Sequence, residues 1–586
     1  MHFTTLVALA LGSVVAGQNN YPNMPVDFLQ TTNPVTPLPQ GKPWGGATAQ
    51  NTNPYTNPPN TGVIRSFDFT ISRGKISPDG YEKNALLVNN QFPGPLIEAN
   101  WGDTIQVTVH NEIVGPEEGT ALHWHGLLQH GTQYMDGVPG ISQCPIPPNG
   151  TFTYTFNADL YGTSWWHSHY SAQYVGGLFG PMIIHGPSIA NYDIDVGPVL
   201  LTDYFHKDYY SLVEDVVSTD FNKVLQPSDN NLINGHNNFN CSTITLNSTA
   251  KCTSNAGVAT FQFTAGKTHR LRLINAGAEG MQKFSIDGHN LTVIAQDFVP
   301  VNPYDTQVVT LGIGQRTDVL VKAPAGYKGK SFTMRSSLAG NGCSITIQPD
   351  ATAVVYYDTM HTPNTTAWPA FLDSVAHQCA NDPISITTPL YPMKPTPPTT
   401  TKEIDINFAQ NETGYWLWTM NDVSFRANYN DPVFLLAATG NDSYPMDPEW
   451  NVYNFGTNSS IRIVISNPGP AAHPMHLHGH NFYVLDVGTG AWDGTTIVNA
   501  DNPQRRDTQI VPAAGYLVIQ FEADNPGAWP LHCHIAWHVS AGLYVTVLER
   551  PDEITATKVP SIMAQTCRDW SAFTGGYVID QIDSGL

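Results

Sequence analysis

The sequence predicts an all-β fold built from several consecutive sandwich domains. Apolar and polar residues alternate in short runs, 13% of the residues are charged, and 49 Gly and 45 Pro supply frequent turns. Short alternating strands separated by turn residues are typical of β-sandwiches and Greek-key barrels. At 586 residues the chain is too long for a single hydrophobic core, so three or four domains are expected.

The strand pattern starts three times along the chain. The predicted strands of the first two units cover residues 63–72, 84–88, 103–111, 260–264, 269–274, 291–295 and 317–322. A stretch rich in Pro and Thr, residues 389–401, reads as a linker before the pattern restarts at Lys402. We therefore expect an extended N-terminal segment at 18–61, followed by three domains at 62–187, 188–386 and 402–549. A linker at 387–401 follows the second domain, and a partly helical tail covers 550–586.

The first residues of the chain indicate a secreted protein. Residues 1–17 hold an apolar run followed by Val15-Ala16-Gly17, which is typical of a signal peptide cleaved near Gln18. A net charge of -22 argues against a nucleic-acid partner and against anionic membranes. We expect an extracellular or cell-wall protein without a membrane span. Eight glycosylation sequons fit that location: Asn149, Asn240, Asn247, Asn290, Asn364, Asn411, Asn441 and Asn458.

Seven cysteines are an odd number for a secreted chain, so one of them should have a role other than pairing. Cys533 lies between two histidines and is the candidate. The other six allow fifteen connectivities. Proximity in sequence favours Cys241 with Cys252 and Cys343 with Cys379, which leaves Cys144 for Cys567 as a long-range clamp on the tail.

Histidines occur in His-x-His pairs more often than chance predicts for 21 histidines. Residues two apart on a strand face the same side, so each pair can direct two imidazoles into one cavity. Imidazole suits copper, zinc and iron, so these pairs alone do not select the metal. The first and third units each contain two pairs and the second contains none, which predicts metal sites between the outer two units. The four pairs are His123/His125, His167/His169, His476/His478 and His532/His534.

Cys533 selects copper among these metals. Strand alternation directs Cys533 to the face opposite His532 and His534, so one thiolate serves one site while its neighbours serve another. Together with His473 and His538, Cys533 would supply the trigonal ligands of a blue-copper electron-transfer centre. Leu543 stands where a weak axial methionine would be expected. Because leucine cannot coordinate, we expect a three-coordinate copper with a raised potential.

These motifs resemble the four copper signatures of the multicopper oxidases. The matching segments are His123-Trp124-His125-Gly126, Trp166-His167-Ser168-His169, His473-Pro474-Met475-His476-Leu477-His478-Gly479 and His532-Cys533-His534-Ile535-Ala536-Trp537-His538. With residues 90–95 and 505–507, the similarity runs from Val63 to Leu586. The resemblance implies three cupredoxin-like domains and four coppers. Type 1 would be held by His473, Cys533 and His538, type 2 by His123 and His476, and the type 3 pair by His125, His167, His169, His478, His532 and His534.

Within that family the chain is most similar to the ascomycete-type fungal laccases. Its last residues, Asp583-Ser584-Gly585-Leu586, resemble a C terminus that plugs the channel to the trinuclear site. This resemblance implies a monomeric enzyme that oxidises phenols by one electron at type 1 copper and reduces dioxygen to water at the trinuclear cluster. It also implies a carboxylate for the phenol proton, proton donors for dioxygen, and aromatic walls beside type 1 copper. Glu279 would take the phenol proton. The proton donors for dioxygen would be Asp136, Asp507 and Asp583. The aromatic walls would be Trp416, Trp418 and Trp537.

Several alternatives stay open from the sequence. One is a related oxidase dedicated to coupling phenols in pigment, melanin or secondary-metabolite formation. A ferroxidase would need a carboxylate cluster beside type 1 copper, and the sequence shows no clear one. Ascorbate and bilirubin oxidases usually keep the axial methionine, whereas this chain has Leu543. A non-catalytic cupredoxin-like copper-binding protein should lack some of the eleven ligands that this chain contains. The physiological substrate is not readable from the residues.

Overall fold

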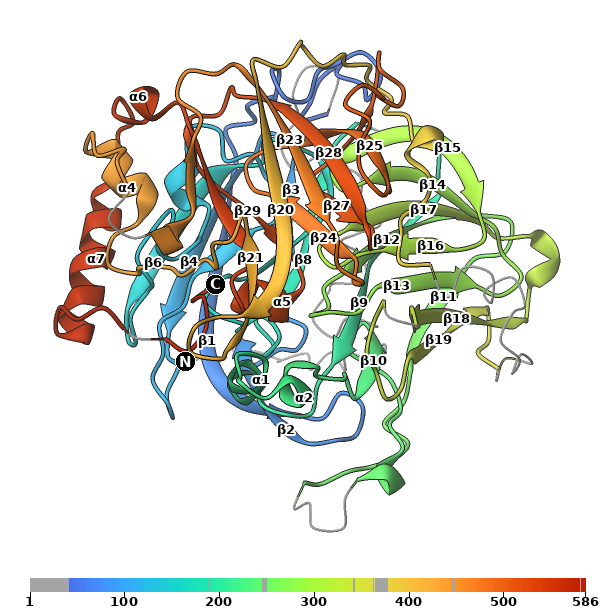
Figure 1. The fold of residues 1–586 in the computed structure, drawn as a ribbon. Helices are drawn as coiled ribbons and strands as arrows, with labels where there is room; N and C mark the ends of the chain where they lie inside the picture. Colours follow the sequence, from blue (N-terminus) through green and yellow to red (C-terminus); the bar gives the residue numbers. More distant parts are fainter. Residues whose placement is uncertain are drawn as a thin grey trace, which may run out of the picture.

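The computed structural model of the protein describes residues 42–187, 189–244, 250–340, 343–361, 363, 378–444, 448–579 and 581–586. Within these ranges the strands form six sheets, which pair into three sandwiches in chain order (Figure 1). The predicted all-β fold with three cupredoxin-like sandwiches is therefore confirmed. The predicted signal peptide, residues 1–17, and the sequons at Asn247 and Asn364 lie outside the described residues.

The first sandwich pairs two four-stranded sheets, of strand order β2-β1-β4-β6 and β3-β8-β7-β5. Every second residue of β4 is buried, as the alternation of apolar residues predicts. The predicted strand at 63–72 continues to Ile76 in the structure. The elements are β1 (Ile64–Ile76), β2 (Lys83–Val88), β3 (Ile97–Asn100), β4 (Thr104–Asn111), β5 (Leu122–Trp124), η2 (Gln133–Met135), β6 (Thr151–Asn157), β7 (Gly162–Ser168) and β8 (Phe179–His185).

The second sandwich pairs a six-stranded sheet, β10-β9-β12-β17-β14-β15, with a five-stranded sheet, β11-β19-β18-β13-β16. Two short helices follow β9 and lie below β21 and α5 in Figure 1. The elements are β9 (Ile194–Tyr204), α1 (Tyr209–Val216), α2 (Phe221–Val224), β10 (Asn230–Ile233), η3 (Cys241–Thr243), β11 (Ala259–Phe263), β12 (Thr268–Asn275), β13 (Gln282–Ile286), β14 (Leu291–Gln296), β15 (Val299–Thr306), β16 (Val309–Leu311), β17 (Arg316–Lys322), η4 (Ala325–Tyr327), β18 (Ser331–Leu338), β19 (Asp350–Tyr357) and η5 (Ile384–Ile386).

The third sandwich repeats this plan, with sheets β21-β20-β23-β28-β25-β26 and β22-β30-β29-β24-β27. The tail after Arg550 is partly helical, as predicted. The elements are β20 (Thr400–Gln410), β21 (Trp416–Met420), α4 (Val433–Ala438), η6 (Pro448–Trp450), β22 (Val452–Asn454), β23 (Ser460–Asn467), β24 (His473–Leu477), β25 (Phe482–Thr489), β26 (Gln504–Arg506), β27 (Thr508–Val511), β28 (Gly515–Glu522), β29 (Gly527–Cys533), α5 (Ala536–Ser540), β30 (Tyr544–Glu549), α6 (Pro551–Ile554) and α7 (Ser561–Thr574).

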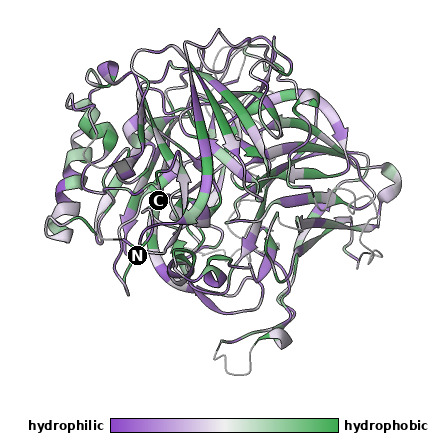
Figure 2. Cartoon of the chain, viewed as in Figure 1, coloured by the Kyte–Doolittle hydropathy of each residue, from purple (hydrophilic) through white to green (hydrophobic). Residues whose placement is uncertain are grey.

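The hydrophobic cores of the first and third sandwiches are continuous. One cluster of buried side chains includes Trp124 and Trp165 of the first sandwich and Leu477 and Cys533 of the third. Much of the second sandwich packs around a cluster of its own. Figure 2 shows apolar residues concentrated on strands in the interior of the molecule. The continuous core holds the two histidine-bearing sandwiches in a fixed relation.

The three expected disulfides are present, and Cys533 is the free and buried cysteine of the chain. The Cys144–Cys567 bridge joins residues 423 apart in sequence. It attaches α7 to the first sandwich, so the tail is held against the body of the protein.

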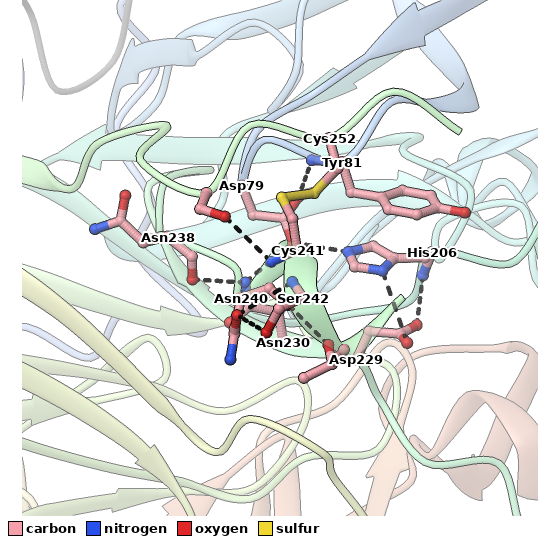
Figure 3. The surroundings of a disulfide bond; sticks show 12 residues. Asp79, Tyr81, His206, Asp229, Asn230, Asn238, Asn240, Cys241, Ser242 and Cys252 are labelled. Carbon is pink, nitrogen blue, oxygen red and sulfur yellow. Dashed lines mark hydrogen bonds and ion pairs between the residues drawn. A yellow bond between two sulfur atoms is a disulfide. The ribbon is translucent and has the colours of Figure 1, made fainter. Parts of the chain in front are cut away.

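The Cys241–Cys252 loop contacts the first sandwich (Figure 3). Tyr81 stacks on His206, with ring centroids 3.9 Å apart, and forms a β-bridge with Cys252. The buried carboxylate of Asp79 accepts hydrogen bonds from His206 Nε2 at 2.8 Å and from Asn230 at 3.0 Å. This network fixes the second sandwich relative to the first. No helix in the described part of the chain is long and apolar enough to cross a membrane.

Candidate metal centre

Two pairs of neighbouring strands bring the His-x-His elements together. In the first sandwich β5 lies beside β7, with His123 opposite His167. In the third sandwich β24 lies beside β29, with His476 opposite His532. The second histidine of each pair follows two residues later and therefore faces the same side. Each sandwich thus presents four imidazoles to the other.

The eight imidazoles of these four pairs meet in one buried cavity, and each is at most 4% exposed. His125 stacks on His476 with ring centroids 3.9 Å apart, and His123 lies 4.0 Å from His478. The nearest nitrogens are 3.1 Å apart between His478 and His532, and 3.2 Å between His125 and His534. All eight predicted trinuclear ligands are therefore neighbours in space, although residues 123 and 534 are far apart in sequence.

Hydrogen bonds on one ring nitrogen direct the other nitrogen into this cavity. His123 Nδ1 and His476 Nδ1 each lie 2.8 Å from a backbone carbonyl oxygen, and His167 Nδ1 lies 3.0 Å from one. Since Nδ1 donates in these contacts, Nε2 carries the lone pair. The Nε2 atoms of these three histidines are buried and lack a hydrogen-bond partner among the described residues. Buried lone pairs without donors fit metal ions, and carbonyl-bonded imidazoles are the usual ligands.

Burial favours the neutral form of most of the cavity histidines. Desolvation is the main cause that lowers the pKa of seven imidazoles, to about 4 for His532, and neighbouring imidazoles lower the pKa further: these seven are His125, His167, His169, His476, His478, His532 and His534. A neutral imidazole is the form that binds a metal. The cavity is thus built to hold cations other than protons.

A second cluster lies on the other face of β29. Cys533 Sγ is 3.5 Å from His538 Nδ1 and 3.7 Å from His473 Nδ1, and these two nitrogens are 3.0 Å apart. Burial raises the pKa of the Cys533 thiol and lowers the pKa of His473 to about 3. A buried thiolate needs a bound cation to offset its charge, and one sulfur with two imidazoles is a set that suits copper. Leu543 is fully buried nearby and bonds to both ligand segments through its backbone.

The predicted proton donors lie at different distances from the histidines. Asp136 is buried, and its carboxylate accepts from His478 Nδ1 at 2.8 Å. Asp507 lies 3.2 Å from His125 and forms a two-point ion pair with Arg316, at 2.7 and 2.6 Å. Burial raises the pKa of Asp583 to about 6, and this carboxylate accepts from Ser171 rather than from a cavity histidine.

The second sandwich closes the histidine cavity, a contribution that the sequence did not indicate. Gly314 has φ +85°, and a Cβ there would lie 2.7 Å from the ring of His534 and 3.0 Å from that of His125. Arg316, at the start of the following strand β17, reaches Asp507. A lone glycine and an arginine carry no motif, so only the fold reveals their place.

The C terminus reaches the histidine cavity. Residues 583–586 are buried, and Leu586 lines a small void together with His167, His169, His532 and His534. Backbone bonds hold this segment, because Gly585 O accepts from Ser171 N and Ser584 N donates to Ser540 O. The segment therefore packs against the histidine cavity.

A larger cavity of about 610 Å³ lies beside the second cluster. His538, Trp418, Trp537 and Glu279 line it. The third predicted wall, Trp416, is absent from this lining and stacks on Phe408, a lining residue, with ring centroids 5.3 Å apart.

Asp203 is a further buried carboxylate that no sequence motif indicated. It accepts hydrogen bonds from the backbone N–H groups of Ala278, Glu279 and Gly280, at 2.6 to 2.8 Å. Burial and the charge of Asp203 raise the pKa of Glu279 to about 8. Asp203 therefore fixes the loop that carries Glu279 and influences its ionisation.

Three sandwiches, an eight-histidine cavity and a cysteine–histidine cluster on opposite faces of one strand define a copper protein of the cupredoxin class. The chain belongs to the multicopper oxidase family, which matches it over residues 70–189, 195–359 and 395–553. It is accordingly an oxidase, and copper is its expected metal.

The relatives include fungal laccases. Laccase-2 of Botryotinia fuckeliana is 37% identical over 553 residues, which cover 92% of this chain and 91% of that protein. Dihydrogeodin oxidase of Aspergillus terreus is 35% identical over 572 residues, which cover 91% and 92%. The solved laccase of Botrytis aclada has a TM-score of 0.83 at 34% identity, covering 93% of this chain and 98% of that one. The resemblance to ascomycete-type fungal laccases is thereby confirmed.

Proposed function

We propose that the chain is a laccase with four coppers. Type 1 copper is assigned to His473, Cys533 and His538, and type 2 to His123 and His476. When bound, copper supplies one-electron oxidation at the first site and reduction of dioxygen at the cavity. The type 3 pair is assigned to the six remaining histidines, His125, His167, His169, His478, His532 and His534. The buried ring nitrogens without donors at His123, His167 and His476 support this assignment.

The observation that carries the function is the shared strand β29. Cys533 belongs to one cluster while His532 and His534 belong to the other. Were copper held by His538 and Cys533, electrons from a donor at His538 would reach Cys533, which the backbone joins directly to His532 and His534. Four phenols lose four electrons and four protons, and one dioxygen takes up both to give two waters. Asp136, Asp507 and Asp583 are assigned to hold or deliver protons on the dioxygen side.

Glu279 is assigned as the acceptor of the phenolic proton. It lines the same cavity as His538, and in the part of the chain that the structure describes its carboxylate bonds to no other side chain. The phenol loses its proton as it loses its electron, so an ionised carboxylate at this position eases the step. With a pKa of about 8, only about a tenth of Glu279 is ionised at pH 7.

Phenol oxidation is therefore expected to rise with pH and to level off above about pH 8. Glu279→Gln should remove this rise and lower kcat/KM for 2,6-dimethoxyphenol by about a hundredfold at pH 8. The measurement is oxygen uptake between pH 5 and 9. Ferrocyanide, which releases no proton, is the control donor and should be oxidised equally by both proteins. Equal losses for both donors would assign Glu279 a structural role only.

Leu543 is expected to set the potential of the type 1 site. Leu543→Met would place a weak thioether donor beside the Cys533 cluster, where it would stabilise the oxidised metal. The reduction potential of the site should therefore fall. For a one-electron couple, a fall of about 60 mV corresponds to a tenfold shift in the equilibrium towards the oxidised metal. A redox titration of the blue absorption measures it. An unchanged or higher potential would place Leu543 away from the axial position.

A second candidate is an oxidase dedicated to coupling phenolic metabolites or pigment precursors. The similarity to dihydrogeodin oxidase, at 35% identity, favours this narrower role. Both roles use the same chemistry and differ in the phenol that the cavity selects.

The remaining assignments concern the whole chain. We assign residues 583–586 as a plug at the mouth of the trinuclear site, which the buried position of Leu586 supports. We also propose domain boundaries at 187/188, 386/387, 401/402 and 549/550. The protein is proposed to be secreted and monomeric. The acidic charge of -22 and the three disulfides are consistent with an extracellular protein.

A further inference from the structure

The cavity beside His538 is larger than a single phenol ring requires. Its volume is about 610 Å³. An apolar cavity of about 150 Å³ already holds one benzene ring. The space next to the electron-entry histidine is therefore roughly four times that minimum and lies in the range that encloses molecules of several rings.

The walls of this cavity are held by rigid elements. The loop between β23 and β24 contributes Pro468 and Pro470, whose rings restrict the backbone. Cys343, which also lines the cavity, is fixed by its disulfide to Cys379. A wall that does not rearrange can bind an extended rigid ligand without a large entropic cost. The volume is thus a property of the fold and not of mobile side chains alone.

Polar and apolar groups are distributed unevenly around the cavity. The lining contains one carboxylate, Glu279, in the same cavity as His538. Apolar side chains elsewhere on the lining remain partly uncovered: Phe221 is 44% exposed, Leu225 49% and Ile345 37%. Exposed apolar side chains that belong to a cavity are typical of a binding surface for an apolar ligand. A ligand with one hydroxyl-bearing ring and a further apolar ring would satisfy both parts.

We propose that this cavity selects phenols with two or more fused rings. The hydroxyl-bearing ring would lie between His538 and Glu279, and the distal ring would cover Leu225 and Ile345. This proposal rests on the proposed phenol oxidase function and specifies its substrate class. The electron leaves through His538, the proton goes to Glu279, and dioxygen is the terminal oxidant.

The test compares catechol with 2,3-dihydroxynaphthalene, which carries the same diol on two fused rings. For the wild-type holoenzyme we expect KM to be about tenfold lower for the naphthalene diol, because the second ring is buried in the cavity. A Leu225→Ser/Ile345→Ser double variant should raise KM for the naphthalene diol about tenfold more than it raises KM for catechol, which would abolish the preference for the fused rings. Both positions are partly exposed, so folding should not suffer.

Ile347→Ser is the matched control. Ile347 is 58% exposed and lies two residues from Ile345, but it does not line the cavity. This variant should behave as the wild type towards both diols. Equal KM values for the two diols in the wild type, or equal changes for both in the double variant, would overturn the proposal. Oxidation of ferrocyanide with no oxidation of either diol would instead overturn the phenol oxidase function on which it rests.

Discussion

Replacing Cys533 by Ser is expected to abolish the blue thiolate-to-copper absorption and to lower phenol oxidation by about a thousandfold or more. Cys533 contributes the sulfur that lies 3.5 Å from His538 and 3.7 Å from His473. A hydroxyl in its place is a poor copper ligand, and the path from the phenol to His532 and His534 would be interrupted. Absorption spectra and oxygen uptake with 2,6-dimethoxyphenol and with ferrocyanide measure the effect.

The same variant should leave the eight-histidine cavity intact, because its imidazoles are positioned by backbone carbonyls and by Asp136 rather than by the thiol. EPR of the type 2 copper should therefore match the wild type. A normal blue band in the Cys533→Ser protein would remove the type 1 assignment.

Deleting Asp583–Leu586 is expected to slow reoxidation of the reduced enzyme by dioxygen about ten- to a hundredfold. The deletion removes Leu586 from the void beside four cavity histidines and removes the carboxylate bonded to Ser171. Water would enter the space and the imidazoles would lose a packing neighbour. Stopped-flow reoxidation and EPR of the type 2 copper measure the change.

Two controls separate the tail's contributions. Leu586→Ala removes only the side chain in the void and should cause a smaller change, whereas Val578→Ser, at a position 57% exposed, should cause none. The blue absorption should persist in all three proteins, because the cysteine lies on the opposite face of β29. Unchanged dioxygen kinetics and EPR in the truncated enzyme would mean that the tail is only a surface segment.

The strands, and the common facing of the two histidines in each His-x-His pair, were predictable because they follow from short-range periodicity. The predicted strand 291–295 corresponds to β14, Leu291–Gln296, and 317–322 to β17, Arg316–Lys322. Alternation along β29 likewise placed Cys533 opposite its two neighbours, and the structure shows two clusters there. Residues fixed by strand geometry leave a local trace in the sequence.

Contacts between distant segments leave no such trace. Gly314 approaches His534 from another sandwich, and Asp203 holds the Glu279 loop through backbone N–H groups that any sequence would supply. Trp416 was predicted to be a cavity wall, but its side chain stacks on Phe408 and does not line the cavity. The volume of the cavity beside His538 also depends on segments from separate domains. These features required the assembled fold.

The copper content of the purified holoenzyme tests the central assignment most directly. We expect four coppers per chain in the wild type and three in Cys533→Ser, because eleven ligands form one three-ligand site and one eight-histidine cavity. Two or fewer coppers in the wild type, or an unchanged content in the Cys533→Ser protein, would contradict the assignment of one copper to Cys533 and three to the histidine cavity.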